Sequence, residues 1–226
     1  MHLRKLIFAS ILLTVVAFGQ VWGPVPVTLD TAYQVKYMGN LNIADAYINI
    51  ANTGAINASP FGPGSQGGLG GICVNVYAFS MDEQMVNCCT CPVTANGHVS
   101  LSAQKDILSN TLTPYPPTSL LVKLLATVPS AANQALTYAD FLSKGCTDAQ
   151  LLPADAVPAN GLAAWGTTTH VTPAGSTLSE TPFTPSTLSI GESARLRNLC
   201  TLMKGNGSGY GICKTCKPGA LAATKK

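Results

Sequence analysis

The sequence predicts a mainly β protein: a disulfide-stabilised antiparallel β-sandwich with a short C-terminal helix and a cysteine-rich tail. Short runs of alternating apolar and polar residues recur along the chain between glycine- and proline-rich breaks, which is typical of the half-buried strands of a sandwich. Eight cysteines follow an N-terminal export signal, and this combination indicates an oxidising compartment. One capped amphipathic segment near the C-terminus predicts a helix.

Residues 1–19 have the layout of a secretory signal peptide. Basic residues near the start precede an apolar run over 6–18, and Ala17 and Gly19 are the small residues at positions −3 and −1 of a cleavage site. The run is too short for a membrane span, which needs about 20 apolar residues. A buried N-terminal helix is the alternative. We expect a secreted chain, extracellular or at the cell surface, with no membrane span after cleavage.

Residues 20–40 are predicted to form an N-terminal strand or arm. The apolar positions of its two period-two runs are Val25, Val27 and Leu29, followed by Tyr33, Val35 and Tyr37. Prolines at 24 and 26 confine the first run to a sheet edge, because proline cannot donate a ladder hydrogen bond. These six residues are the candidates for self-association by strand donation to a neighbouring subunit. The alternative is that the arm is the first strand of its own sandwich.

Residues 41–128 are predicted to form the sandwich core. Asn96-Gly97 is a signal for a type I′ hairpin turn, and 54–71 is a glycine-rich loop. The period-two patterns predict strands over 46–51, 72–79, 85–91, 99–103 and 120–124. The residues expected to be buried in this core are Val74, Val76, Val99, Leu101, Val122 and Leu124.

Residues 129–187 are predicted to be a loop-rich extension with a short helix over 137–144 and a strand over 162–171. The Pro/Thr/Ser-rich segment 173–187 is interpreted as a connector. Residues 188–226 are predicted to form a C-terminal helix and a basic tail. Ser189-x-x-Glu192 is a capping box that begins a helix to about Lys204. The apolar face of this helix consists of Leu196, Leu199, Cys200 and Met203, of which Leu199 and Met203 are expected to face the sandwich core.

The cysteines are predicted to form disulfides in the exported chain. Spacing alone does not decide their pairing, so the connectivity stays open. The eight residues concerned are Cys73, Cys88, Cys89, Cys91, Cys146, Cys200, Cys213 and Cys216.

Two other interpretations of the cysteines are weaker. Cys88-x-x-Cys91 and Cys213-x-x-Cys216 resemble the paired knuckles of a zinc site, but residues 92–212 separate them, far more than the roughly 15–20 of a zinc ribbon. A redox CxxC centre at 88–91 is disfavoured because the segment is predicted at a hairpin and not at the N-terminus of a helix. We therefore predict no metal and no cofactor.

The charge pattern favours packing against other copies of the chain. Charged residues make up 10% of the sequence, against about a quarter in ordinary globular domains, so the surface provides little electrostatic repulsion. The C-terminal end is basic and suits an anionic surface polymer, but a solvated helix face and a frayed tail are the simpler explanation. No aromatic residues interleave with these cations, so nucleic-acid binding is not predicted. The cations of this end are Arg195, Arg197, Lys204, Lys214, Lys217, Lys225 and Lys226.

No catalytic signature is present in the sequence, and the chain is not predicted to be an enzyme. His98 and His170 are the two histidines outside the signal peptide, and no G-x-S-x-G or similar motif accompanies them. The glycine-rich loop over 205–211 follows a helix, whereas a phosphate-binding loop must begin one.

Four stretches carry a resemblance to a known group of proteins: residues 73–114, 163–173, 179–189 and 206–216, the last reading NGSGYGICKTC. Together they resemble a group of cysteine-rich secreted proteins of acidobacteria for which no activity is established. The resemblance covers most of residues 45–220. It implies a bacterial surface or extracellular protein and transfers no catalytic residues.

Three functions follow as expectations. The first is a structural subunit of an extracellular filament or cell-surface assembly, with copies of the chain linked by N-terminal strand donation. The second is a secreted binding module whose loops 54–71 and 205–212 capture a glycan or another extracellular ligand. The third is a hydrolase or redox enzyme whose motifs have diverged beyond reading.

Overall fold

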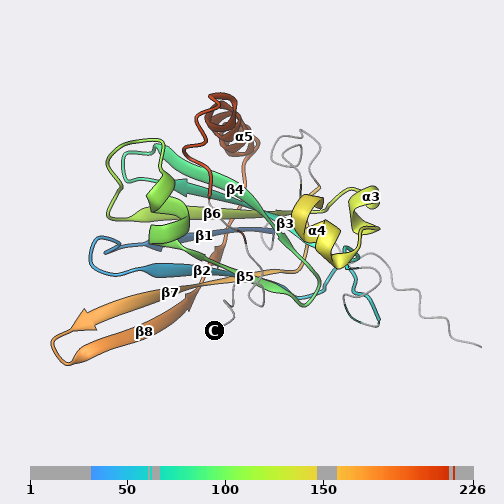
Figure 1. The fold of residues 1–226 in the computed structure, drawn as a ribbon, viewed down its shortest axis with the longest axis horizontal. Coiled ribbons are helices and arrows are strands. Elements are labelled where there is room, and N and C mark those ends of the chain that lie inside the picture. The colour runs from blue at the N-terminus through green and yellow to red at the C-terminus, as the bar shows by residue number, and fades with distance from the viewer. Residues whose placement is uncertain (1–31, 61, 63–66, 147–156, 214–215, 217–226) are drawn as a thin grey trace, which may run out of the picture.

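The protein is an antiparallel β-sandwich, as the sequence predicts (Figure 1). A computed structural model describes residues 32–60, 62, 67–146, 157–213 and 216. Sheet A has the strand order β4-β3-β6-β1-β9, and sheet B has the order β5-β2-β7-β8. Every strand pairing in both sheets is antiparallel.

The elements have the following bounds. Sheet A consists of β1 (Tyr33–Met38), β3 (Ile72–Phe79), β4 (Met85–Val93), β6 (Leu120–Thr127) and β9 (Thr184–Pro185), and sheet B of β2 (Ala46–Asn52), β5 (His98–Ser102), β7 (Leu162–Thr172) and β8 (Gly175–Pro182). The helical elements are the π-helical turn η1 (Ala103–Ile107), the 3₁₀ turn η2 (Leu108–Asn110), and helices α3 (Ala131–Gln134), α4 (Tyr138–Lys144) and α5 (Ile190–Gly205).

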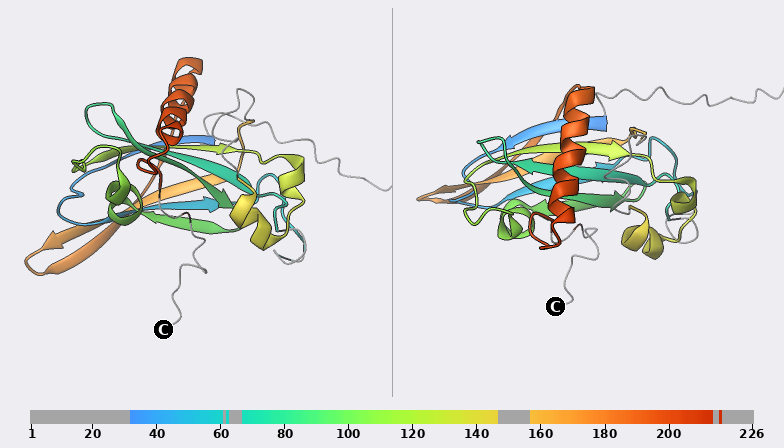
Figure 2. Two further views of the ribbon diagram at one scale, coloured as in Figure 1. Left: turned by 45° about the horizontal axis from the view of Figure 1, so that its top comes forward. Right: turned by 90° about the horizontal axis from the view of Figure 1, so that it is seen from above.

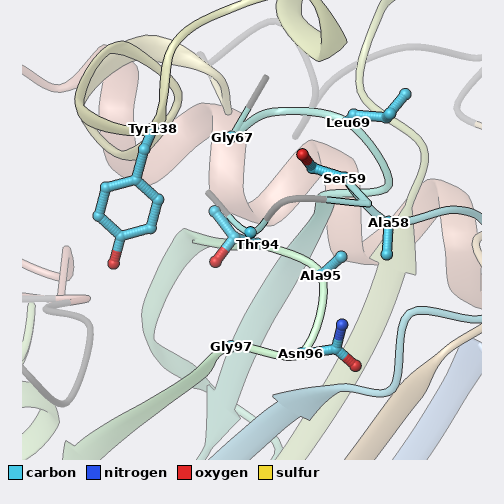
Figure 3. Close-up of a pocket in the computed structure, with 10 residues that line it drawn as sticks. Ala58, Ser59, Gly67, Leu69, Thr94, Ala95, Asn96, Gly97 and Tyr138 are labelled. Carbon is cyan, nitrogen blue, oxygen red and sulfur yellow. The ribbon is translucent and has the colours of Figure 1, made fainter. Parts of the chain in front are cut away.

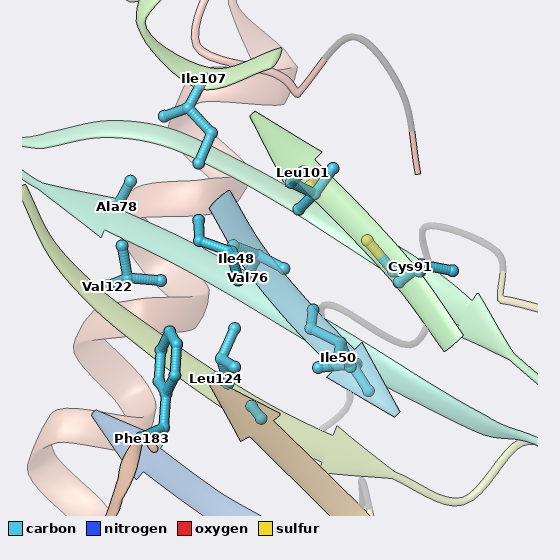
Figure 4. Packing of buried hydrophobic residues seen from close by; sticks show 14 of the residues in the cluster. Ile48, Ile50, Val76, Ala78, Cys91, Leu101, Ile107, Val122, Leu124 and Phe183 are labelled. Atoms are coloured by element: carbon cyan, nitrogen blue, oxygen red, sulfur yellow. The ribbon is translucent and has the colours of Figure 1, made fainter. Parts of the chain in front are cut away.

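The main core lies between the two sheets and contains all six residues predicted for it. Successive side chains of a strand point to opposite faces, so alternate residues of each strand meet in one layer. In Figure 4, Ile48 and Ile50 of sheet B lie against Val76 of β3 and Leu124 of β6. The predicted set, each member at most 1% exposed, is Val74, Val76, Val99, Leu101, Val122 and Leu124.

A second apolar cluster lies on the outer face of sheet A, beneath α5. Every residue of β3 is buried, because its other face, which carries Tyr77, packs in this cluster with Leu196 and Met203 of the helix. Figure 2 shows α5 lying across the strands of sheet A. The expectation that Leu199 and Met203 face the core between the sheets is therefore wrong, because strand side chains already fill that space.

Helix α5 begins and ends where its sequence predicts. The Ser189 side chain accepts a hydrogen bond from the backbone N–H of Glu192 at 3.1 Å, and the helix ends at Gly205. The Glu192 carboxylate forms an ion pair with Lys123 of β6 at 2.5 Å. The helix start is thus attached to the sheet that it covers.

The helix and the strand predicted within residues 129–187 are present as α4 and β7. Strand β1 is paired with β6 on one side and with β9 on the other, which is the alternative to a separate arm. Strand β7 pairs with β2 inside sheet B, so this part of the predicted extension belongs to the sandwich. The connector over 173–187 contains β8 and β9. Its Thr and Ser residues lack an apolar alternation because β8 is exposed on both faces.

The Asn96-Gly97 prediction is wrong in its topology. The turn exists, with the Gly97 N–H donating to the Thr94 carbonyl at 2.8 Å, but β4 and β5 lie in different sheets. Only Asn96 of the two residues has a positive φ, 60°, whereas a type I′ turn needs two. The turn is a corner between the sheets.

Several N-terminal predictions lie outside the described residues. They are the signal peptide over 1–19 and the first run of the arm, Val25, Val27 and Leu29. Among the residues that are described, none of the helices is both long and apolar enough to span a bilayer.

Candidate functional site

The eight cysteines form four disulfides, as predicted: Cys73–Cys146, Cys88–Cys200, Cys89–Cys213 and Cys91–Cys216. The first joins β3 to the chain just after α4, and the second joins β4 to α5. The last two join β4 to the C-terminal tail. This set of bridges is consistent with an extracellular protein.

Neither CxxC motif forms a disulfide within itself. Cys88 points to the outer face of sheet A and bonds Cys200. Cys89 and Cys91 belong instead to the cluster between the sheets. Cys88 and Cys91 lie on opposite faces of one strand. They are therefore not placed to act together, as a zinc knuckle or a redox CxxC requires.

The sulfurs of the two tail disulfides lie close together at the edge of sheet A. The Sγ atoms of Cys89, Cys91 and Cys216 all lie within 4.8 Å of one another. The Sγ atoms of Cys89 and Cys216, which belong to different disulfides, are 3.7 Å apart. Cys213, bonded to Cys89, completes a group that we call the four-cysteine cluster.

A pocket of about 300 Å³ opens at the end of the sandwich near α4 (Figure 3). Its wall combines the aromatic ring of Tyr138 with the polar side chains of Ser59, Thr94 and Asn96. Part of the predicted glycine-rich loop forms one side of it. The lining residues are Ala58, Ser59, Gly62, Gly67, Leu69, Thr94, Ala95, Asn96, Gly97 and Tyr138.

Asn52, which is 2% exposed, holds the two loops that form the pocket. Its side-chain amide donates to the carbonyls of Gly70 and Val93 at 2.9 and 3.0 Å, and its side-chain oxygen accepts from the N–H of Gly54 at 2.9 Å. Its backbone carbonyl accepts from the N–H of Asn96. One buried amide thus positions both the loop over 54–71 and the corner after β4.

A shallow apolar groove lies beside α5 on the outer face of sheet A, with two adjoining hollows of about 420 and 380 Å³. Lys123 and Arg195 lie over the ring of Phe79, at 4.7 and 5.5 Å from its centroid. Both cations are already paired, Lys123 with Glu192 and Arg195 with Glu83. We interpret these contacts as fastening α5 to the sheet.

Buried tyrosines beneath α5 stay neutral at ordinary pH. Burial, and to a smaller extent the nearby Glu192 carboxylate, raises the pKa of Tyr33 to about 12. Burial also raises the pKa of Tyr77. Because an ionised phenol is disfavoured there, this part of the protein loses stability as the pH rises above about 10, the ordinary pKa of tyrosine.

Strands β7 and β8 form a two-stranded ribbon that projects beyond the body of the sandwich (Figure 1). Lys36 of β1 crosses Gly166, where a Cβ would lie 2.4 Å from its side chain, and donates to the hydroxyl of Thr181 on β8. Burial lowers the pKa of Lys36. The base of the ribbon is thereby attached to sheet A, and its outer part is exposed.

His98 and His170 lie on exposed surface. His98 begins β5 and is exposed. The Nε2 atom of His170 lies 2.7 Å from the Ser179 hydroxyl across the ribbon. The described interactions of His170 include no carboxylate that would orient the ring as in a Ser-His-Asp triad, and none of the described pockets contains either histidine.

The self-association candidates are divided by the structure. Tyr33, Val35 and Tyr37 lie in β1, which is hydrogen-bonded to β6 along its whole length. These three residues are therefore part of the subunit's own sheet, which is the alternative to donation that the sequence left open. The physical reason is that β1 fills the place between β6 and β9 in sheet A.

Sequence reasoning missed two features that the structure brings forward. One is the exposed edge of β8, which a polar, proline-containing segment does not reveal. The other is Tyr138, which a helix prediction alone does not place beside a loop. No protein-family model, curated protein or solved structure matches this chain. The functional proposal therefore rests on the chain's own residues.

Proposed function

We propose that the chain is a secreted structural subunit of an extracellular filament or cell-surface assembly. In this proposal the N-terminal segment of one copy, residues 20–31, adds as a strand to the outer edge of β8 in the next copy. The single observation that carries the proposal is the β8 edge on the projecting ribbon.

Strand β8 is the last strand of sheet B, and no described strand pairs with its outer edge. Trp165 of β7 pairs with Pro182 of β8. Proline has no N–H to donate, so we assign Trp165 and Pro182 to a pair that is not hydrogen-bonded. Hydrogen-bonded and non-hydrogen-bonded pairs alternate along an antiparallel ladder, so every second residue of β8 counted from Pro182 directs its backbone N–H and C=O groups away from β7. These residues are Ser176, Leu178 and Glu180. Such an edge accepts an added strand.

The N-terminal segment is suited to be that strand. Pro24 and Pro26 alternate with Val25, Val27 and Leu29. In an extended strand the two prolines face the same edge, so that edge lacks donors, and the opposite edge keeps the N–H groups of the apolar residues. Such a strand can pair with a sheet through one edge only. Its proline-containing edge does not accept a further strand.

The chain direction also supports open assembly. The donated segment precedes β1 of sheet A, whereas the accepting edge belongs to sheet B. The two surfaces are different, so each contact is heterologous, and heterologous contacts that do not close into a ring give filaments. The low content of charged residues, 10%, keeps the repulsion between subunits small.

Deleting residues 20–31 is expected to convert polymers of the mature chain into folded monomers. The deletion ends before β1 because loss of that strand would open sheet A. Leu178→Lys is expected to have the same effect, since Leu178 is 69% exposed on the accepting edge and a lysine there opposes strand addition. Light scattering after size exclusion, with electron microscopy, measures the assembly state.

Ile190→Lys is the matched control. Ile190 is also exposed and apolar, at 90%, but it lies at the start of α5, so this variant should polymerise normally. A synthetic peptide of residues 20–31 should bind the deletion variant and should not bind a deletion variant that also carries Leu178→Lys. Monomeric wild-type chain, or polymers that persist after the deletion, would refute strand donation.

The second candidate function is glycan binding, which the pocket beside Tyr138 favours. An aromatic ring next to hydroxyl and amide groups suits a sugar, which presents both apolar C–H faces and hydroxyls. Of the two loops predicted to bind, the one over 54–71 contributes to this pocket. The loop over 205–212 is instead held by Asn110, which donates to the carbonyls of Gly209 and Ile212.

Tyr138→Ala is expected to weaken oligosaccharide binding about tenfold, corresponding to the loss of roughly 1.4 kcal/mol of ring contact. Tyr115→Ala is the control, because Tyr115 is 85% exposed and does not line the pocket. A glycan array followed by calorimetry on the best ligand provides the measurement. Equal binding by both variants would exclude this pocket as the site.

A further inference from the structure

The four-cysteine cluster combines two neighbouring segments of chain. Cys89 and Cys91 are two residues apart on β4, so their side chains lie on the same face of the strand. Cys213 and Cys216 belong to the tail and form a C-x-x-C spacing, which is common in metal knuckles. Within the described residues, Cys89, Cys91 and Cys216 are the one group whose donor atoms are close enough to hold a metal ion.

Hydrogen bonds hold the tail beside β4 independently of its disulfides. The Cys88 N–H donates to the Gly211 carbonyl at 2.8 Å, and the Gly211 N–H donates to the Asn110 carbonyl at 2.7 Å. Ile212 forms a parallel bridge with Cys88, and its carbonyl accepts from the Asn110 side chain at 2.8 Å. The residue before Cys213 is thus placed against β4 by backbone and side-chain hydrogen bonds that do not involve the disulfides.

The sulfur positions are close to those of a tetrahedral metal site. A Zn–S bond is about 2.3 Å, so neighbouring sulfurs of a regular tetrahedron are about 3.8 Å apart. The Sγ atoms of Cys89 and Cys216 already lie 3.7 Å apart although no bond joins them. All three sulfurs of the group lie within 4.8 Å of one another. Formation of a four-sulfur site therefore requires the Cys213 side chain, which is bonded to Cys89 in the oxidised chain, to rotate toward the other three sulfurs after reduction.

We propose that Cys89, Cys91, Cys213 and Cys216 form a tetrathiolate zinc site in the reduced chain. A disulfide oxidant that accepts four electrons from the four thiolates converts this site into the two tail disulfides and releases the Zn²⁺. A dithiol reductant supplies four electrons and four protons to the two disulfides, which become four thiols. Binding of one Zn²⁺ then releases four protons as the thiols become thiolates. In either state the tail stays attached to β4.

The surroundings of the cluster suit this ion. Cys89 and Cys91 are buried against the core, and sulfur ligands in an apolar setting favour zinc over the oxygen-seeking Mg²⁺ and Ca²⁺. This inference does not depend on the proposed assembly function.

The test uses the full mature chain, reduced with a dithiol and freed of reductant without oxygen. We expect it to bind one Zn²⁺ per chain by elemental analysis. The zinc-bound chain is then unfolded without chelator and treated with an alkylating agent. Bound Zn²⁺ should protect the four cluster cysteines, whereas the other four cysteines should react, and peptide mass spectrometry identifies the alkylated residues. Co²⁺ in place of Zn²⁺ should show the intense absorption of tetrahedral thiolate coordination.

Two variants that each remove two cysteines separate this site from general thiol binding. Cys213→Ser/Cys216→Ser should lose stoichiometric Zn²⁺, whereas Cys73→Ser/Cys146→Ser should keep it. Because the alkylation pattern is read on the wild-type chain, a variant that fails to fold does not decide the result. Reduced wild-type chain without bound Zn²⁺, protection spread over other cysteines, or undiminished binding by the tail variant would each overturn the proposal.

Discussion

Val122→Asp is expected to abolish folding of the chain. Val122 is fully buried between the sheets on the central strand β6, where a carboxylate would have no partner. An uncompensated buried charge costs several kcal/mol, a large part of the roughly 5–15 kcal/mol that stabilises a typical domain. The expected result is loss of the far-ultraviolet β signal and rapid proteolysis.

Leu121→Asp is the matched control for this experiment. It adds the same charge one residue earlier on the same strand, but Leu121 points outward and is 37% exposed. The free energy of unfolding should change by less than about 1 kcal/mol, as for most surface substitutions. If Val122→Asp folds as well as Leu121→Asp, then the register of β6 that places Val122 inside is wrong.

Removing both tail disulfides is expected to cost about 5 kcal/mol, whereas removing either one costs about 2 kcal/mol. Cys89–Cys213 and Cys91–Cys216 join the same two short segments, at sequence separations of 124 and 125. While one bridge is closed, the other closes a ring of only a few residues, so its loop-closure entropy is small. Without both bridges, the unfolded chain is unconstrained from the tail back to the bridged Cys200, so the lost loop-closure entropy is larger.

Paired Cys→Ala substitutions make this measurement without leaving a free thiol. Urea unfolding of the two single-bridge variants and of the double variant gives the three free energies. The expected non-additivity is the distinctive result, because independent bridges would add. Equal costs for the first and second bridge removed would show that the two do not share one loop.

The strands of the core were predictable because alternate residues of each point into one buried layer. In β3 and β6 the residues that alternate with period two, such as Val76 and Leu124, meet in one apolar layer. The α5 boundaries were predictable for a local reason, since Ser189 caps the first turn through its own side chain. Both patterns are formed by residues that lie close together in the sequence.

Strand β8 was missed because that signal is lacking. A ribbon exposed on both faces needs no apolar alternation, and its pairing with β7 comes from backbone hydrogen bonds that any Thr or Ser can make. The hairpin predicted at Asn96-Gly97 was wrong for a related reason. A turn is local, but whether the chain returns to the same sheet or crosses to the other depends on the distant strands that complete each sheet.

The sequence by itself determined the β-rich class, the buried face of each core strand, the C-terminal helix and the use of the cysteines as disulfides. Composition, period-two patterning and capping are local, and burial enforces them directly. Only the tertiary structure decided which cysteines meet, that β1 lies inside its own sheet, and that β8 forms an exposed edge. Those facts depend on contacts between residues far apart in the chain, such as Cys89 with Cys213, and local sequence patterns do not predict such contacts.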